Sequence, residues 1–205
     1  MFAAFPAELL RALRLTLVMA AILGLLYPLA ITGIAQGAFN RQANGSLVTN
    51  QQGQVIGSEL IGQEFTSPQY FNGRVSATVD AGNPDRDQPY NAENSAGSNL
   101  GPANQELQDR VQKDVEQIRH KNGLAPNQPV PVDLVTADFS GLDPAISEQS
   151  ALIQVDRVAR TRHLGPGKVR ALVERHVHGR VLGIFGEPYV NVLEVNQALD
   201  DGGAR

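Results

Sequence analysis

Side chains that commonly carry catalysis or metal binding are sparse in this 205-residue chain, which has four histidines and no cysteine. His176 and His178 are two residues apart, so a helix would point them to opposite sides, whereas helical zinc sites use an i, i+4 pair. Asp133, Asp138 and Asp143 recur every five residues, which does not match the alternating oxygen ligands of a calcium loop. The serine-hydrolase pattern Gly-x-Ser-x-Gly does not occur. The sequence therefore predicts no catalytic residue, no metal site and no cofactor of the chain's own.

One glycine-rich segment, residues 95–102 (SAGSNLGP), could bind an anion through its backbone N–H groups, with Ser98, Asn99 and Gly101 as candidates for a nucleotide site. The segment lacks the Gly-Lys-Ser/Thr of a P-loop and does not match the dinucleotide fingerprint. The alternative is a turn that caps the helix after it, since Gly, Asn and Ser favour turns. The sequence favours this second interpretation, and no nucleotide-binding residue is assigned.

The elements that would position these residues alternate between short strands and helices. A stripe of Leu107, Val111, Val115 and Ile118 predicts a helix over about 103–120 that stops at Asn122-Gly123. Further helices are predicted at about 148–163 and 167–177, and strands near 47–48, 54–66, 130–137, 181–185 and 189–195. Helices clustered between short strands indicate an α+β domain.

Residues 67–103 are rich in Gly, Pro, Asn, Asp and Ser and show no long apolar period. A connection of this length without regular structure is unusual in a compact domain unless it is functional or disordered. Its aromatic residues favour an ordered lobe. We therefore expect a subunit interface here, with Tyr70, Arg74, Asn91 and Asn99 as candidate contact residues. The alternative is that the Gly and Asn residues only serve tight turns.

Residues 15–34 contain no charge and would form a helix about 30 Å long, the thickness of a bilayer's hydrocarbon core. A cleaved signal is the competing interpretation, because residues 33–35 and 35–37 are small-x-small sites, but its apolar region is usually only about 7–15 residues. The length favours a single-pass membrane anchor. Gly and Pro are common in membrane helices, yet the small-xxx-small pairs Ala20/Gly24 and Gly33/Gly37 suggest a packing face, and Pro28 suggests a kink.

Arg11 and Arg14 precede the span and only Arg41 follows it closely, so the positive-inside rule places the N-terminus in the cytoplasm. The predicted organisation is an N-terminal segment and transmembrane helix (1–37), a single extracytoplasmic α+β domain (38–199) and a disordered tail (200–205). The net charge is −4 and no basic run occurs, so nucleic acid is not an expected partner.

Several segments together resemble the C-subunit family of the Kdp potassium-transporting P-type ATPases. The resemblance runs from the span to Leu199, and the segments that carry it are 57–63 (GSELIGQ), 70–74 (YFNGR), 97–102 (GSNLGP), 130–136 (VPVDLVT), 154–160 (QVDRVAR) and 186–193 (GEPYVNVL). Each segment alone would be a weak signal, whereas their combination is specific.

The resemblance implies an accessory, non-catalytic subunit in the bacterial inner membrane. Its partners would be a channel-like potassium-selective subunit, an ATP-hydrolysing P-type subunit and a small membrane peptide, in a complex that uses ATP and Mg and transports potassium. The family is described as needed for assembly and as a catalytic chaperone that raises the pump subunit's affinity for ATP. Because ATP binds in the cytoplasm and the domain is predicted outside, we expect any such effect to be coupled through the membrane complex.

Two functions of other classes remain open from the residues alone. One is an anchored or secreted solute-binding protein with its pocket in the 67–103 lobe, and the other is an extracytoplasmic enzyme. Co-purification distinguishes them, since only an accessory subunit would be recovered with large polytopic partners.

Overall fold

The structure of the protein, a computed structural model, describes residues 5–203. The chain divides into two compact units, one ending at Ser46 and one beginning at Leu47. The sequence placed this boundary nine residues earlier, after residue 37. In its described residues, 5–46, the regular elements of the first unit are all helices: α1 (Phe5–Ala21), the π-helix η2 (Ile22–Leu26), α2 (Tyr27–Ala38) and α3 (Asn40–Ala43).

The first unit carries one helix that is long and apolar enough to cross a membrane, Pro6–Ala38, with a mean hydropathy of 2.2. It is interrupted where the sequence predicts a kink. Pro28 has no N–H to donate to the carbonyl of Gly24, and the backbone widens into the π-helix η2 immediately before it. The Tyr27 N–H donates to Ile22 O, five residues back, so the proline is accommodated without ending the helix.

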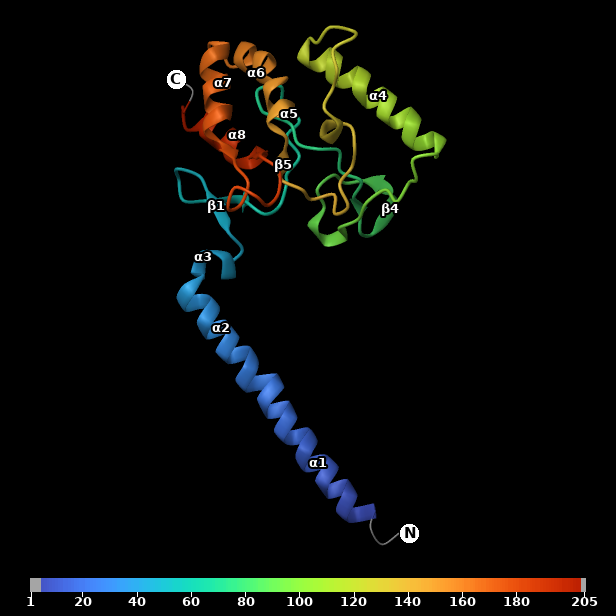
Figure 1. The fold of residues 1–205 in the computed structure, drawn as a ribbon, viewed down its shortest axis with the longest axis vertical. Coiled ribbons are helices and arrows are strands. Elements are labelled where there is room, and N and C mark those ends of the chain that lie inside the picture. The colour runs from blue at the N-terminus through green and yellow to red at the C-terminus, as the bar shows by residue number, and fades with distance from the viewer. Residues whose placement is uncertain (1–4, 204–205) are drawn as a thin grey trace. The chain divides into compact units, whose positions relative to one another are not determined.

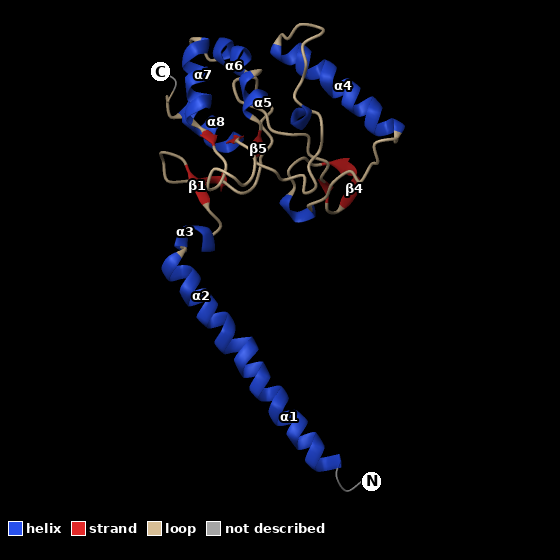
Figure 2. Ribbon diagram, viewed as in Figure 1, coloured by secondary structure: helices blue, strands red, loops and turns tan. Residues whose placement is uncertain are grey.

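The second unit is a mixed helix and strand domain, which confirms the predicted α+β class (Figure 1). Long loops connect its elements, as Figure 2 shows in tan. Its helices are η3 (Ala92–Asn94), α4 (Gln105–Asn122), η4 (Val132–Leu134), α5 (Glu148–Leu152), α6 (Val155–Thr161), α7 (Pro166–Arg175) and α8 (Val192–Asp200). Its strands are β1 (Leu47–Thr49), β2 (Val55–Ser58), β3 (Val79–Asp80), β4 (Asn83–Asp87), β5 (Ala145–Ile146), β6 (Val177–His178) and β7 (Tyr189–Asn191).

The strands form small antiparallel sheets, β1–β2, β3–β4 and the three-stranded β5–β7–β6 with β7 in the middle. In the last sheet Val190 lies opposite both Ile146 and Val177, and Val190 is fully buried. The apolar faces of α5 to α8 pack against this sheet and form one core. Its fully buried members include Phe71, Val158, Val169, Val173, Val190 and Val195.

The helix predicted at about 103–120 is confirmed as α4, two residues further along the chain. Asn104 is its N-cap and accepts a hydrogen bond from the Glu106 N–H. Gly123 ends it in the left-handed conformation at φ +68°, where a glycine costs least. The apolar stripe of α4 is only half-buried, with Ile118 packed at the edge of the core.

The strand predicted over 130–137 is wrong, because these residues form the short 3₁₀ helix η4. Pro131 has no N–H for a ladder and is the N-cap of that turn. Only Ala137 makes a strand-like contact, an isolated parallel bridge to Val75. Leu134 and Val135 are buried here without a partner strand, whereas Val132 is exposed.

The predicted strand at 189–195 is right for only three residues, since α8 begins at Val192. Asn191 ends β7 and caps the helix, accepting from the N–H groups of Leu193 and Glu194. The other predicted strand, 181–185, is also wrong. It is a tight turn closed by a bridge between Val181 and Phe185.

Two further differences concern helix lengths and the C-terminus. The predicted helix at 148–163 is two helices, because the chain turns at Ile153 and Gln154 between α5 and α6. The tail was expected to be disordered from residue 200. Instead Asp200 closes α8 and binds Arg162, and the Gly203 N–H donates to Ala198 O. Residues 1–4 and 204–205, which the predicted segments also included, lie outside the described residues.

Candidate functional site

A segment that begins in a turn, residues 68–72, is held in the domain by side-chain amides in place of a neighbouring strand. Asn196 of α8 accepts from the Phe71 N–H at 2.8 Å and donates to Phe71 O at 2.9 Å. Gln154 likewise accepts from the Asn72 N–H at 2.8 Å and donates to Asn72 O at 3.1 Å. Both carboxamides are 1% exposed, so they satisfy backbone groups that water does not reach.

Arg157 of α6 completes this arrangement from the centre of the domain. It is 3% exposed and uses all its nitrogens. Its five hydrogen bonds go to Asn122 Oδ1 (2.9 Å), Pro68 O (2.5 Å), Tyr70 O (2.9 Å), Asn72 Oδ1 (3.2 Å) and Gln154 Oε1 (2.7 Å). Burial lowers the pKa of Arg157 to about 10, so the guanidinium stays charged at neutral pH. We call Asn122, Gln154, Arg157 and Asn196, with the segment 68–72 that they hold, the Arg157 network.

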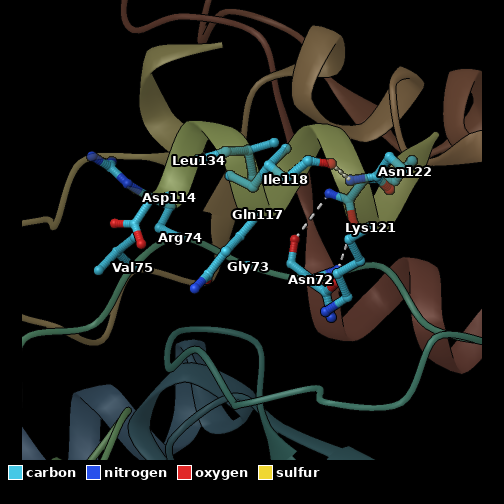
Figure 3. Close-up of a pocket in the computed structure, with 11 residues that line it drawn as sticks. Asn72, Gly73, Arg74, Val75, Asp114, Gln117, Ile118, Lys121, Asn122 and Leu134 are labelled. Carbon is cyan, nitrogen blue, oxygen red and sulfur yellow. Dashed lines mark hydrogen bonds between the residues drawn. The ribbon is translucent and has the colours of Figure 1, made fainter. Parts of the chain in front are cut away.

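A cavity of about 190 Å³ lies beside this network, between α4 and residues 72–75 (Figure 3). Figure 3 shows α4 supplying Asp114, Gln117, Ile118, Lys121 and Asn122 to one wall. The opposite wall consists of backbone and side chains of residues 72–75, with Leu134 and Gln154 completing the lining.

The ionisable groups of this cavity are perturbed by burial. Burial raises the pKa of Asp114, and its Oδ2 is buried without a hydrogen-bond partner. Burial, followed by the charge of Arg157, lowers the pKa of Lys121. Arg74 places its Nη1 2.9 Å from Asp143 Oδ2, while its Nε has no partner. The cavity thus presents both signs of charge in a small volume.

Of the four candidate interface residues, three have side chains that bond to other residues of the same domain. Tyr70 donates to Asp200 Oδ2 at 2.9 Å, and Arg162 lies over its ring at 4.8 Å. Arg74 pairs with Asp143. Asn91 was expected to face outward, but it is 6% exposed and its amide donates to Val79 O.

Asn99 is exposed, with its backbone in the left-handed region at φ +53°. Together with Ser98 it lines a second cavity of about 170 Å³, whose other wall includes Asp138. Burial alone would raise the pKa of Asp138, but hydrogen bonds from Ser140, Gly141 and Asp143 outweigh it and hold the pKa below its usual range. Asp138 therefore contributes a negative charge to the wall of this cavity, which disfavours an anion there.

The N-terminal end of α4, which follows the glycine-rich loop, is capped by side chains of the chain itself. Asn104 caps it and Glu106 lies in its first turn, so the helix dipole is already compensated by the chain itself. Gly101 has open space around the position of a Cβ atom. These contacts support the interpretation of residues 95–102 as a capping turn.

The histidines and aspartates singled out by spacing also have structural partners. His176 Nδ1 lies 2.8 Å from Leu172 O, and His178 Nε2 lies 2.6 Å from Glu194 Oε2. The helix α7 ends at Arg175, so His178 is on β6 and not on a helix as expected. Asp133 accepts from the hydroxyl of Ser150 at 2.7 Å and from the Ser147 N–H at 2.7 Å.

The small residues of the apolar helix have no packing role within the first unit. A Cβ atom at Gly24, Gly33 or Gly37 would meet nothing within 4 Å. No residue in the most apolar part of this helix is buried within the described structure. Its exposed side chains are those expected to contact lipid or other helices.

The Arg157 network is the part of the domain that sequence reasoning missed. Gln154 and Arg157 lie three residues apart, so they share a face of the predicted helix, but this face is roughly opposite to that of Leu152, Val155 and Ala159, which pack in or against the core. Polar residues on that face are expected to meet water, so their spacing gave no signal of burial. Asn196 lay just beyond the predicted strand 189–195 and gave no signal either.

Comparisons with known proteins agree with this architecture. The family model described as "KdpC: K+-transporting ATPase, c chain" matches residues 9–201. A potassium-transporting ATPase KdpC subunit of Bradyrhizobium diazoefficiens is 51% identical over 202 residues, 97% of this chain and 98% of the relative. The corresponding protein of Rhodopseudomonas palustris strain BisB5 is 53% identical over 197 residues, 94% and 96% of the two chains. That of Methylobacterium nodulans is 52% identical over 201 residues, 94% and 98%.

An apolar N-terminal helix followed by a single α+β domain defines the class of the protein, a subunit of a membrane transport ATPase. The chain belongs to the KdpC family of potassium-transporting ATPase subunits, because the family model and the relatives both cover nearly its whole length. The resemblance stated from the sequence segments is therefore confirmed.

Proposed function

We propose that this chain is an accessory, non-catalytic subunit that holds together an ATP-driven potassium import complex. The observation that carries the proposal is family membership over residues 9–201. The geometry supports it, because the ionisable side chains at the centre of the domain are used to fix its own backbone. Arg157 is the chief example, with each of its hydrogen bonds directed to a neutral acceptor of the same domain.

The proposed arrangement is a single-pass protein with its N-terminus in the cytoplasm and the α+β domain outside. The apolar part of the helix Pro6–Ala38 supplies the span, and Arg11 and Arg14 near the N-terminal end of this helix supply the charge bias. The proposed partners are a potassium-selective channel-like subunit, an ATP-hydrolysing P-type subunit and a small membrane peptide. Gly24, Gly33 and Gly37 are proposed packing positions for their helices, since a bulky side chain there would block close approach.

Any effect of this subunit on ATP affinity is proposed to be indirect. The candidate nucleotide loop lines a cavity together with Asp138, and the helix end beside it is capped by Asn104. Neither feature favours a phosphate. Stabilisation of one state of the membrane complex by this subunit would change ATP affinity through coupling, with no nucleotide bound to the chain.

A solute-binding function is less well supported by the cavity beside the Arg157 network. Its volume is about 190 Å³, whereas ligand sites usually enclose about 300–1,000 Å³. Arg74, which lines the cavity, is already paired with Asp143. The cavity therefore does not favour this alternative over the accessory role.

Co-purification of the tagged full-length chain tests the proposal. We expect the chain to be recovered with large polytopic partners, and potassium-stimulated ATPase activity to be lost from membranes that lack it. Recovery of the chain alone, with the partner complex intact and active without it, would contradict the accessory role.

Limited proteolysis of intact cells whose outer barrier is opened tests the orientation. A protease added from outside should digest the α+β domain and leave the membrane helix protected. Full protection of the domain would reverse the orientation, and a mature chain that begins near Gln36 would identify a cleaved signal.

A further inference from the structure

A short turn between β6 and β7 carries four large apolar side chains that are exposed at the surface of the α+β domain. We call residues 181–185 the apolar turn. Its four apolar side chains are exposed by 63–83%: Val181, Leu182, Ile184 and Phe185. They are consecutive except for Gly183, so they form one continuous patch on a domain whose surface is otherwise largely polar. Contiguous exposed apolar residues of this kind mark interaction sites in soluble domains.

The apolar turn is closed by its own hydrogen bonds. The Val181 N–H donates to Phe185 O at 2.9 Å, and the Phe185 N–H donates back to Val181 O at 3.0 Å. Leu182 adopts the left-handed backbone at φ +54°, which is costly for a residue with a Cβ atom. Such a conformation persists where surrounding structure holds it, and it is typical of functional positions. The turn therefore presents its side chains in one fixed arrangement.

The base of the apolar turn is also ordered and carries no excess charge. Arg180 on one side lies 2.5 Å from Glu187 on the other, which neutralises both. Below this pair the rings of His178 and Tyr189 stack, with centroids 4.8 Å apart and planes 11° from parallel. These two residues are opposite each other in the β6–β7 ladder. The strands thus anchor the turn in the buried sheet.

We propose that the apolar turn is an anchor that inserts into an apolar pocket on the extracytoplasmic face of another subunit of the transport complex. The inference rests on the proposed accessory function. A protein pocket fits the turn better than a lipid surface for two reasons. The turn is prearranged, which suits a complementary pocket, and its basic residue is already paired, so it offers no attraction to anionic lipid headgroups.

Substitution of Leu182 by Asn separates binding from folding. Asn tolerates the left-handed backbone better than Leu, so Leu182→Asn should leave the fold intact or slightly more stable. The same change removes the most exposed side chain of the patch, at 83%. A central apolar anchor contributes disproportionately to binding, so retention of the chain in the complex should weaken by about tenfold or more.

A matched pair of valines controls for the loss of an exposed apolar residue in general. Val181 in the apolar turn is 67% exposed, and Val132 in η4 is 69% exposed. Val181→Asn should weaken association with the complex, whereas Val132→Asn should leave it unchanged. Equal retention of both variants and of Leu182→Asn at the wild-type level would overturn the proposal.

A fluorescent label identifies what covers the turn. The chain has no cysteine, so Leu182→Cys in the full-length chain can carry one environment-sensitive dye. In nanodiscs without partners the emission should remain that of a water-exposed dye, and it should shift to the blue when the other subunits are added. A blue shift in nanodiscs alone would assign the turn to lipid, and no shift in either sample would leave it in water. Both results overturn the partner assignment.

The two proposals fail differently. If the wild-type chain does not co-purify with partners, the accessory function itself is wrong. If the wild-type chain co-purifies and the Leu182→Asn variant does so equally well, the accessory function stands and only the anchor is wrong.

Discussion

Replacing Arg157 by Met is the most direct test of how the domain is held together. Met fills much of the same space and adapts to irregular cavities, but it donates no hydrogen bond. Gln154 Oε1 also accepts from the Asn72 N–H, so it keeps a partner. The other four acceptors of Arg157 would lose this donor: Asn122 Oδ1, Pro68 O, Tyr70 O and Asn72 Oδ1. Asn122 is buried, Tyr70 and Asn72 are half-buried, and Pro68 is exposed.

The expected loss follows from these four acceptors. Each buried polar group left without a partner costs about 1–3 kcal/mol. The variant recovers part of this, because a charged guanidinium no longer has to be kept out of water. Because three of the four acceptors lie on residues that water partly reaches, we expect a net loss of about 3 kcal/mol. For a domain of this size each kcal/mol lowers the unfolding temperature by about 2–4 °C, so a fall on the order of 10 °C is expected.

Thermal and urea unfolding of the full-length chain in detergent measure this change. Arg160→Met is the matched control, because Arg160 is on the same helix and exposed. That variant should stay within about 0.5 kcal/mol of the wild type, as surface substitutions usually do. If Arg157→Met lies within 1 kcal/mol of Arg160→Met, the network does not hold the segment 68–72, and the reasoning from its hydrogen bonds is refuted.

Three further predictions use the same chain. Gly62→Ala should cost about 1–3 kcal/mol of unfolding free energy, because the new methyl group would lie 2.5 Å from the Tyr90 ring and 2.8 Å from a backbone oxygen. Gly165→Ala is the control and should cost less, because a methyl group there meets open space. Equal losses for the two variants would contradict the packing argument. Burial raises the pKa of Asp114, so the folded state binds more protons between the ordinary and the raised pKa, and the free energy of unfolding falls as pH rises through that window. Asp114→Asn should therefore be more stable than the wild type at pH 7 and similar at pH 3, whereas a difference that does not change with pH would reject this assignment. Gly33→Leu should weaken co-purification with polytopic partners while insertion survives; unchanged recovery would show that the small residue is incidental.

Features that depend on neighbouring residues along the chain could be predicted from the sequence. The apolar helix Pro6–Ala38 followed from an uninterrupted run of apolar residues, because a helix in lipid satisfies its own backbone. The disturbance before Pro28 followed from the missing N–H. The helix α4 and its end at Gly123 followed from a helical apolar period and a glycine stop signal.

The same local signals failed where an element depends on a partner distant in sequence. A strand exists only when another strand supplies hydrogen bonds, and the apolar run 181–185 finds none. It was predicted as a strand, yet it is an exposed turn, and this difference is what makes it a candidate anchor. Asn191 shows the converse case, because its side chain caps α8 and turns a predicted long strand into a short one.

Family resemblance could also be recognised from the sequence, since it is carried by short segments that can be read in order along the chain. What the segments do physically was decided by tertiary structure. The residues of 70–74 are held by Gln154, Arg157 and Asn196 from helices more than 80 positions away. Hydrogen-bond partners so far apart are brought together only by the packing of the core, and no spacing along the chain encodes them.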